Sequence, residues 1–287
     1  MKHIINLILF LSISLSVDIL SIELPVNAKS LSSSGYGIAS KDNHWGNPAS
    51  LSTFDKSYFE FSNNKWLFDV EGSYMSYINK NFKLSGYYWQ VDDIEMYDDI
   101  PSSSPLSTFG SKTFFVDFAE GFNFESHQFG YNLRYAYMKL LEYEDKGFIL
   151  DLGYRYSFND FSSIAILISN LNQGFKDGGQ IPQVAIIGSS QKIKKLPLII
   201  NSDIFFEYSQ SSYTHDKSGI YQGLTFTGKY FDITAGYCYY SESEHLDTSL
   251  GINFLWKNLE FSISTLMKEE ASIGTPVFYQ LSYYLEM

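Results

Sequence analysis

Residues 147–158 of the chain read GFILDLGYRYSF, and apolar or aromatic side chains alternate in this stretch with small, polar or charged ones. Successive side chains of a β-strand point to opposite faces of the sheet. One face of such a strand would carry Phe148, Leu150, Leu152, Tyr154, Tyr156 and Phe158. The other face would carry Ile149, Asp151, Gly153, Arg155 and Ser157. A strand that is apolar on one side and charged on the other suits a membrane barrel, with lipid outside and a polar lumen inside.

The same alternation recurs through most of the chain, most clearly in residues 129–141, 230–241 and 246–256. Strands are predicted near residues 58–62, 66–78, 81–91, 113–125, 129–143, 147–157, 161–170, 183–193, 196–210, 218–227, 230–241, 246–256, 259–267 and 275–286. They number about 14, and single-chain bacterial barrels have an even number of strands. The predicted fold class is therefore all-β, a transmembrane antiparallel β-barrel of about 14 strands in residues 58–287.

The composition agrees with a membrane barrel and excludes several other classes. Aromatic residues make up 18% of the 287 residues, and charged residues also make up 18%, below the roughly 25% of soluble domains. After residue 20 there is no apolar run of about 18 residues, so no transmembrane helix is expected. The net charge of −12 argues against nucleic acid as a partner. The single cysteine, Cys238, excludes an internal disulfide and a cysteine metal cluster.

The lengths of the predicted connections alternate as in outer-membrane barrels, where short turns lie on the periplasmic side and long loops lie outside. Short turns are predicted at residues 79–80, 126–128, 159–160, 194–195, 228–229 and 257–258. Longer outer loops are predicted at 92–112, 142–146, 171–182, 211–217, 242–245 and 268–274, with a short outer turn at Asn63-Asn64. This sorting predicts a barrel that starts from a periplasmic N-terminus.

The first 16 residues, MKHIINLILFLSISLS, have a basic start and an apolar core, as a secretory signal peptide does. Cleavage is expected after Ser16 or after Ala28. The mature protein is then expected in the bacterial outer membrane after Sec export, surrounded by outer-membrane lipid and lipopolysaccharide (LPS).

Between this signal and the first strand lies an aperiodic stretch rich in small and polar residues, LPVNAKSLSSSGYGIASKDNHWGNPASLS at residues 24–52. Its prolines and glycines indicate a defined path for the chain. A barrel of about 14 strands is too wide for its own side chains to fill, since about eight strands already leave room only for side chains or one small ligand. Residues 17–57 are therefore predicted to form a plug or hatch in the lumen.

Several short motifs carry a resemblance to a known family. Residues 23–31 read ELPVNAKSL, residues 35–39 read GYGIA and residues 47–51 read NPASL. Further along stand DLGY at 151–154, SNL at 169–171 and Ile181-Pro182. Together these residues resemble the PorV/PorQ outer-membrane proteins, which are similar in architecture to the FadL transporters of hydrophobic compounds. The chain departs from that pattern at Lys29, Ser34 and Ser50. The resemblance favours cleavage near Ser16, because cleavage after Ala28 would remove part of the matching segment.

The resemblance implies a non-enzymatic component of type IX protein secretion, whose outer loops would bind secretion-system proteins or secreted cargo. An alternative is a FadL-like passive transporter of hydrophobic small molecules, and a third possibility is a purely structural barrel. The resemblance and the composition together mark the plug residues Lys29, Gly35, Gly37, Asn47, Pro48, Ala49 and Leu51. The NPASL run is either a movable hatch or a rigid turn before the first strand. The polar strand faces mark Asn132, Arg134, Asp151 and Arg155 as candidate lumen or tunnel lining.

No catalytic residue, metal site or cofactor is predicted. The acidic stretch at residues 92–99 fits no calcium-loop spacing and is interpreted as a solvated loop. Ser243 and His245 have no third member in sight for a catalytic triad. Four aromatics could line an apolar tunnel or face lipid, and the second is favoured: Phe114, Phe118, Phe122 and Phe124.

Overall fold

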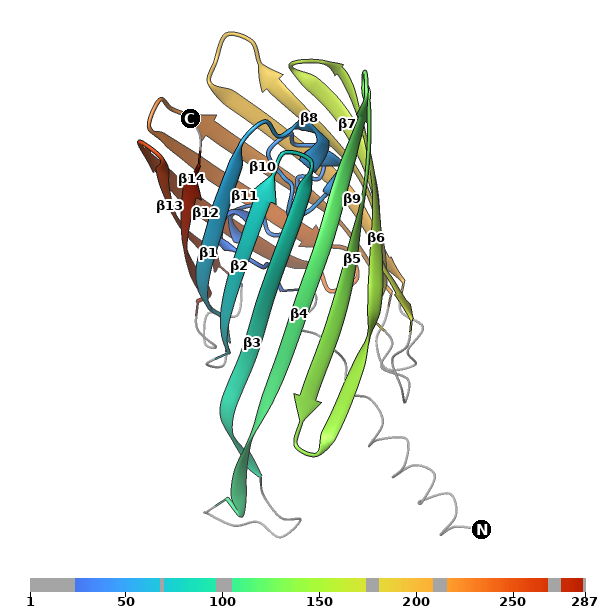
Figure 1. The fold of residues 1–287 in the computed structure, drawn as a ribbon, viewed down its shortest axis with the longest axis vertical. Helices are drawn as coiled ribbons and strands as arrows, with labels where there is room; N and C mark the ends of the chain where they lie inside the picture. Colours follow the sequence, from blue (N-terminus) through green and yellow to red (C-terminus); the bar gives the residue numbers. More distant parts are fainter. Residues whose placement is uncertain are drawn as a thin grey trace.

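The computed structural model of the chain describes residues 24–67, 70–96, 105–173, 181–208, 216–267 and 275–285, and within these residues it is a closed barrel of 14 strands (Figure 1). The predicted signal peptide, residues 1–16, lies outside the described residues. Each strand pairs antiparallel with the next in sequence, and β1 pairs with β14 to close the sheet. The all-β class and the strand number predicted from the alternation are confirmed.

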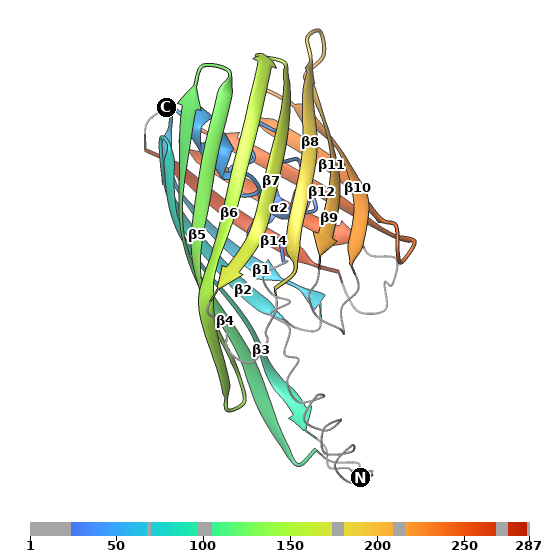
Figure 2. The same ribbon diagram turned by 90° about the vertical axis from the view of Figure 1, so that its right-hand side faces the viewer.

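Strands β3 to β6 are the longest, with 14 to 18 residues, and the other strands have 8 to 12 residues. Their bounds are β1 Ser57–Lys65, β2 Glu71–Asn79, β3 Phe82–Met96, β4 Ser107–Phe124, β5 His127–Leu140, β6 Tyr143–Asn159, β7 Ser162–Gln173, β8 Gln183–Ile193, β9 Leu198–Tyr208, β10 Lys217–Thr227, β11 Phe231–Tyr240, β12 His245–Trp256, β13 Leu259–Met267 and β14 Val277–Tyr284. Figures 1 and 2 show the strands tilted around one lumen.

Alternating burial along the strands separates an apolar outer face from a polar inner face. In β6, Phe148 and Leu152 are half exposed on the outside, whereas Ile149, Asp151 and Arg155 are buried inside. Exposed outer positions throughout the described strands are mainly Phe, Leu, Ile and Tyr, as the hydrocarbon core of a bilayer requires. The period-two pattern from which the strands were predicted therefore has its physical basis in these two environments.

The two ends of the barrel differ in their connections. At the short-turn end the connections are residues 80–81, 125–126, 160–161, 194–197, 228–230 and 257–258. At the long-loop end they are residues 66–70, 97–106, 141–142, 174–182, 209–216, 241–244 and 268–276. The predicted sorting of short and long connections holds, with 141–142 as the exception.

Three predicted boundaries at the long-loop end are wrong. Asn63 and Asn64 are not a turn but the last part of β1, because Asn64 faces inward and its side-chain amide donates to the Val26 carbonyl (2.9 Å). Residues 142–146 belong mostly to β6. In the predicted 92–112 loop, residues 92–96 belong to β3 and residues 107–112 to β4, and Figure 1 shows these two strands extending beyond the other strands. Polar residues in these places face the lumen or solvent, and polarity alone suggested loops.

The helices of the described residues are short, α2 Ala28–Ser32 and η2 Pro48–Thr53. No helix in these ranges is long and apolar enough to cross a membrane.

A charge on the outer face should destabilise the barrel according to its position along a strand. Leu250 lies at the middle of β12 and Trp256 at its end, both exposed on the outer face. Leu250→Arg should lower the free energy of unfolding by about 2–4 kcal/mol, because the guanidinium would sit near the centre of the bilayer. Trp256→Arg, the matched control, should cost at most about 1 kcal/mol. Urea unfolding in lipid vesicles checks this, and equal losses for the two variants would contradict the assigned outer face.

Candidate functional site

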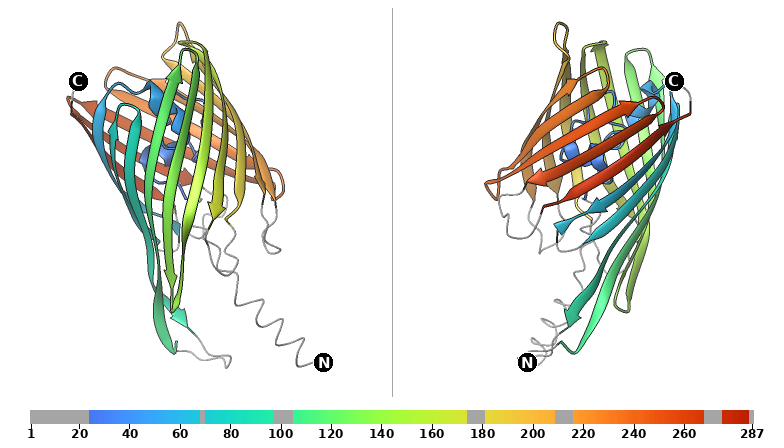
Figure 3. Two further views of the ribbon diagram at one scale, coloured as in Figure 1. Left: turned by 45° about the vertical axis from the view of Figure 1, so that its right-hand side comes forward. Right: turned by 90° about the vertical axis from the view of Figure 1, so that its left-hand side faces the viewer.

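The N-terminal segment, defined as residues 24–56, lies inside the barrel (Figures 1 and 3). Its helix α2 packs against β11, β12, β13 and β14, and its helix η2 packs against β3, β4, β5 and β6. These two groups of strands are separated around the closed sheet by β1 and β2 on one side and by β7 to β10 on the other. The segment therefore reaches from one part of the inner wall to another.

Helix α2 is held by polar groups of the wall. The Asn27 side chain caps the helix by accepting from the Ser30 amide (2.8 Å). The Lys29 ammonium forms an ion pair with Glu260 on β13 (2.8 Å), and both side chains are largely buried. Burial alone would lower the pKa of Lys29, but Glu260 raises it above its ordinary value. The Ser264 hydroxyl donates to a carbonyl of α2 (2.6 Å). Lys29 is thus an anchor of the segment.

Gly37 is the second attachment point. Its φ is +84°, a conformation that L side chains rarely adopt, and Gly35 has a φ of +82°. The turned backbone directs the amides of Gly37 and Ile38 at one carboxylate oxygen of Asp203 on β9, at 2.5 Å and 3.0 Å. Two backbone donors that converge on a carboxylate form a small anion nest. Gly37 therefore serves a contact with the wall, whereas the Gly35 amide donates to the Ser30 carbonyl at the end of α2 (2.8 Å).

The NPASL run folds as an N-terminal cap followed by the 3-10 helix η2. The Asn47 side chain accepts from the Ala49 amide (3.0 Å) and donates to the Ile38 carbonyl (3.0 Å). Leu51 is fully buried in an apolar cluster with Tyr58, Ile78 and Ala119 of the wall. Asn47 therefore joins the two halves of the segment.

Three glycines of the wall lie under this turn. Gly121 on β4 pairs with Gly130 on β5, which pairs with Gly153 on β6. A Cβ atom at Gly130 would lie 2.3 Å from the carbonyl carbon of Pro48, and one at Gly153 would lie 2.1 Å from the Asn47 side-chain oxygen. We call these three residues the glycine row. Only residues without a side chain allow the turn to touch the wall here.

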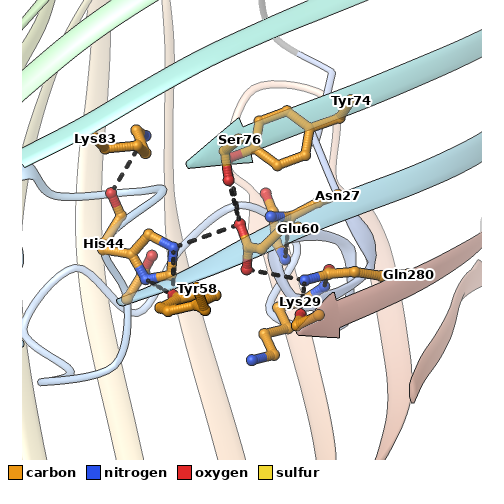
Figure 4. Close-up of polar contacts among 12 residues, drawn as sticks. Asn27, Lys29, His44, Tyr58, Glu60, Tyr74, Ser76, Lys83 and Gln280 are labelled. Carbon is orange, nitrogen blue, oxygen red and sulfur yellow. Dashed lines mark hydrogen bonds and ion pairs between the residues drawn. The ribbon is translucent and has the colours of Figure 1, made fainter. Parts of the chain in front are cut away.

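Glu60 on β1 is the centre of a buried polar network (Figure 4). Its carboxylate accepts from the Ser76 hydroxyl (2.9 Å) and from the Gln280 side-chain amide (2.9 Å). The His44 Nε2 atom lies 3.7 Å from Glu60 and 3.1 Å from the Tyr58 hydroxyl. The N-terminal segment is therefore attached to β1 as well.

The sequence analysis did not identify Glu60 as a candidate site residue, and it predicted no interaction partner for His44. Burial lowers the pKa of His44, so the ring is neutral near pH 7. The Lys83 ammonium donates to the His44 carbonyl (3.5 Å). A signal was available for Glu60, because its alternating neighbours Phe59 and Phe61 are outward residues, which places a charge on the lumen side.

The four candidate lumen residues separate into two places. The Arg134 guanidinium donates to both oxygens of Asp117 (2.9 and 3.2 Å) and lies 3.8 Å from Asp151. The Asn132 amide donates to Asp151 (3.0 Å). Arg155 lies apart from these three and donates to the carbonyl of Ala39 in the N-terminal segment (2.8 Å). Arg134 and Asp151 line a cavity, whereas Arg155 holds the segment.

Two cavities occupy the lumen around the N-terminal segment. The outer cavity, at the long-loop half, has a volume of about 600 Å³. Its apolar lining includes Leu24, Val26, Trp66, Leu167, Val184, Ile186, Tyr240 and Leu266. The inner cavity, at the short-turn half, has a volume of about 310 Å³. Its polar lining includes Lys29, Asn201, Thr225, Asp232, Thr234 and Glu260.

The remaining candidates do not form a site within the described residues. His245 Nε2 lies 2.7 Å from Asp247, but no hydrogen bond joins Ser243 to His245 in the described part of the chain. The tunnel interpretation is wrong for the four aromatics, which are exposed on the outer face: Phe114, Phe118, Phe122 and Phe124. Residues 97–99 of the acidic stretch lie outside the described ranges. Within the described ranges there is no group of three or more side chains placed to bind a metal ion.

Adding one methyl group to the glycine row should disturb the segment. In Gly130→Ala the new Cβ meets backbone atoms of Pro48 and Ala49, which cannot move aside as a side-chain end would. We expect a loss of about 1–3 kcal/mol in unfolding free energy and faster proteolysis of residues 24–56 in the folded barrel. Gly86→Ala is the control, because its Cβ would meet nothing closer than 3.7 Å. Identical proteolysis of both variants would contradict the close contact.

No family model matches the sequence, and no curated protein matches it. Solved structures do match in fold. A TodX deletion mutant, titled a monoaromatic hydrocarbon channel, has a TM-score of 0.63 and 12% identity over 90% of this chain and 98% of its own. The toluene transporter TbuX of Ralstonia pickettii has a TM-score of 0.59 and 14% identity, covering 91% and 97%. A FadL homologue of Pseudomonas aeruginosa has a TM-score of 0.59 and 8% identity, covering 90% and 98%. This chain therefore has the fold of FadL-like outer-membrane channels.

Proposed function

We propose that this chain is a channel of the bacterial outer membrane for the passive transport of small hydrophobic compounds. The observation that carries the proposal is the outer cavity, which lies inside a lipid-facing barrel and has apolar side chains on about half of its wall. A volume of about 600 Å³ is in the range of pockets that enclose small molecules.

The wall of the outer cavity is suited to an apolar guest. Leu167, Ile186 and Leu266 are buried inward-facing residues of β7, β8 and β13. Leu24 and Val26 of the N-terminal segment complete the wall. Apolar surface that a guest removes from water contributes about 25 cal/mol per Å². The charged residues of this cavity are paired with each other, as Glu207 and Lys217 are at 3.1 Å, so they do not need charged ligands.

The fold likeness supports the same function. Chains of similar fold are titled channels for monoaromatic hydrocarbons and toluene transporters. Fold alone does not fix function, because unrelated activities share folds, so the proposal depends on the cavity of this chain. The short-turn end is then the periplasmic side and the long-loop end faces outward.

The N-terminal segment is proposed to act as the plug of this channel, with residues 1–16 as signal peptide, 17–57 as plug and 58–287 as barrel. Its supports are the contacts at Lys29, Gly37, Asn47 and Leu51, which seat it across the lumen. With these contacts, the NPASL run is proposed to be a rigid turn held against the barrel wall. The proposal includes no enzymatic activity and no cofactor.

The first expectation from the resemblance to PorV and PorQ, a role in type IX secretion, stays a prediction. No contact in the described residues and no comparison favours it over transport, so secretion partners and cargo are not carried further.

A polar substitution in the outer cavity should weaken uptake. Leu167→Asn replaces an apolar wall residue by one of similar size that holds water. We expect the initial rate of toluene uptake to fall about tenfold, because a guest must then displace that water. Leu167→Met, the control at the same position, keeps the wall apolar and should retain uptake.

The measurement uses radiolabelled toluene and intact Gram-negative cells that lack their own hydrophobic-compound channels and express the full chain. Uptake no faster than in cells with an empty vector would refute the proposed function. Equal uptake by Leu167→Asn and Leu167→Met would show that the apolar binding site does not include Leu167 and lies elsewhere in the protein.

A further inference from the structure

The two cavities lie on opposite sides of one piece of the N-terminal segment, residues 33–46. Ser33, Gly37 and His44 line the inner cavity, whereas Gly35 and Gly46 line the outer one. Residues of this piece thus line one cavity or the other, and the segment forms the partition between them.

Tyr36 and Trp45 are the lining residues that the two cavities share. A solute that moved from one cavity to the other would therefore pass these two rings. Both residues are partly exposed, in contrast to their neighbours Ile38 and His44, which are buried.

The lumen beside the other wall is filled. An apolar cluster from β2, β3, β4 and β14 occupies it in the long-loop half and contains Tyr74, Tyr87, Trp89, Phe115 and Phe278. Along β4, β5 and β6 the glycine row brings the backbone of η2 into direct contact with the wall. The two cavities therefore approach each other at Tyr36 and Trp45, of which Tyr36 lies against β9 and β10.

The Tyr36 ring is stacked on a wall of aromatic side chains. Its centroid lies 4.8 Å from that of Phe205 and 5.7 Å from that of Tyr221, with interplanar angles of 26° and 24°. Phe205 and Tyr221 are buried. The Trp45 ring meets His44 edge-on, with centroids 4.7 Å apart. Tyr36 thus belongs to a group of stacked aromatic rings, and aromatic rings favour such stacking contacts.

Two polar atoms at this place have no hydrogen-bond partner among the described residues. One is the donor Trp45 Nε1, on a residue that lines both cavities. The other is the acceptor Asn201 Oδ1, on a residue that lines the inner cavity and is 7% exposed. A Cβ atom at Gly37, next to Tyr36, would lie 3.7 Å from the Asn201 side chain. Unpaired buried polar groups are costly, so a guest that pairs with them would be favoured.

We propose that solutes pass along the lumen from the outer to the inner cavity through a constriction formed by Tyr36 and Trp45, and that this constriction selects aromatic compounds that carry a hydroxyl group. The ring stacks beside Tyr36, and the hydroxyl accepts from Trp45 Nε1 or donates to Asn201 Oδ1. An unsubstituted hydrocarbon leaves both atoms unpaired. The inference rests on the proposed transport function and adds to it a route and a substrate class.

The route is tested by removing the rings from the full-length protein in planar lipid bilayers. Tyr36→Ala and Trp45→Ala should each raise the ion conductance about tenfold, and the double variant should raise it further, because the contacts that close the constriction are lost. Phe54→Ala is the matched control, since Phe54 is an aromatic of the same segment that lines the inner cavity alone. Its conductance should stay within about twofold of the parent protein.

The substrate class is tested by calorimetric titration of phenol and toluene into the purified protein. Asn201→Leu keeps the size of the side chain and removes the acceptor, so the affinity for phenol should fall about tenfold while that for toluene stays unchanged.

Folded barrels are recognised in each variant by the shift in gel mobility on boiling. An unchanged conductance in a folded double variant would overturn the route. The same phenol affinity in the parent protein and in Asn201→Leu would overturn the selectivity. Either result leaves the toluene uptake of cells as a separate measurement, so failure of the route and failure of the transport function are distinguishable.

Discussion

The contact between the turn at Asn47 to Ala49 and the glycine row is the constraint on which the lumen depends. The backbone of the turn lies directly against the backbone of the glycine row. This contact fixes the position of the N-terminal segment on β4, β5 and β6. From that position the segment reaches Asp203 through Gly37 and Glu260 through Lys29. The positions of the two cavities follow, since they occupy the space that the N-terminal segment leaves in the lumen.

Electrostatics supports the same arrangement. Charges in a lumen of low dielectric are stable only when they are paired and hydrogen-bonded. Arg134 meets Asp117, Lys29 meets Glu260, and Glu60 accepts from Ser76 and Gln280. Of these pairs, Lys29 and Glu260 join the segment to the wall, so Glu260 has this partner only with the segment in place.

Much of the fold was predictable because the two faces of each strand meet different solvents. The strand at residues 147–158 and most of its neighbours were located by alternation, and errors arose where two consecutive polar residues, the exposed Asn63 and the inward Asn64, imitated a turn. Of the candidate site, Gly37, Asn47 and Pro48 were marked by the resemblance to PorV/PorQ and by the composition of the segment. Asp203 and His44 were not, because a single polar residue in a strand or an aperiodic stretch gives no indication of its partner.

The sequence by itself determined an all-β barrel, its approximate strand number and an irregular segment before the first strand, since these follow from local periodicity and composition. Only the tertiary structure decided where that segment sits and what it leaves open. Gly121, Gly130 and Gly153 are ordinary strand glycines in the sequence, and they become one surface only when β4, β5 and β6 are placed in register. Tyr36 and Trp45 likewise meet both cavities only because the chain turns back inside the closed wall.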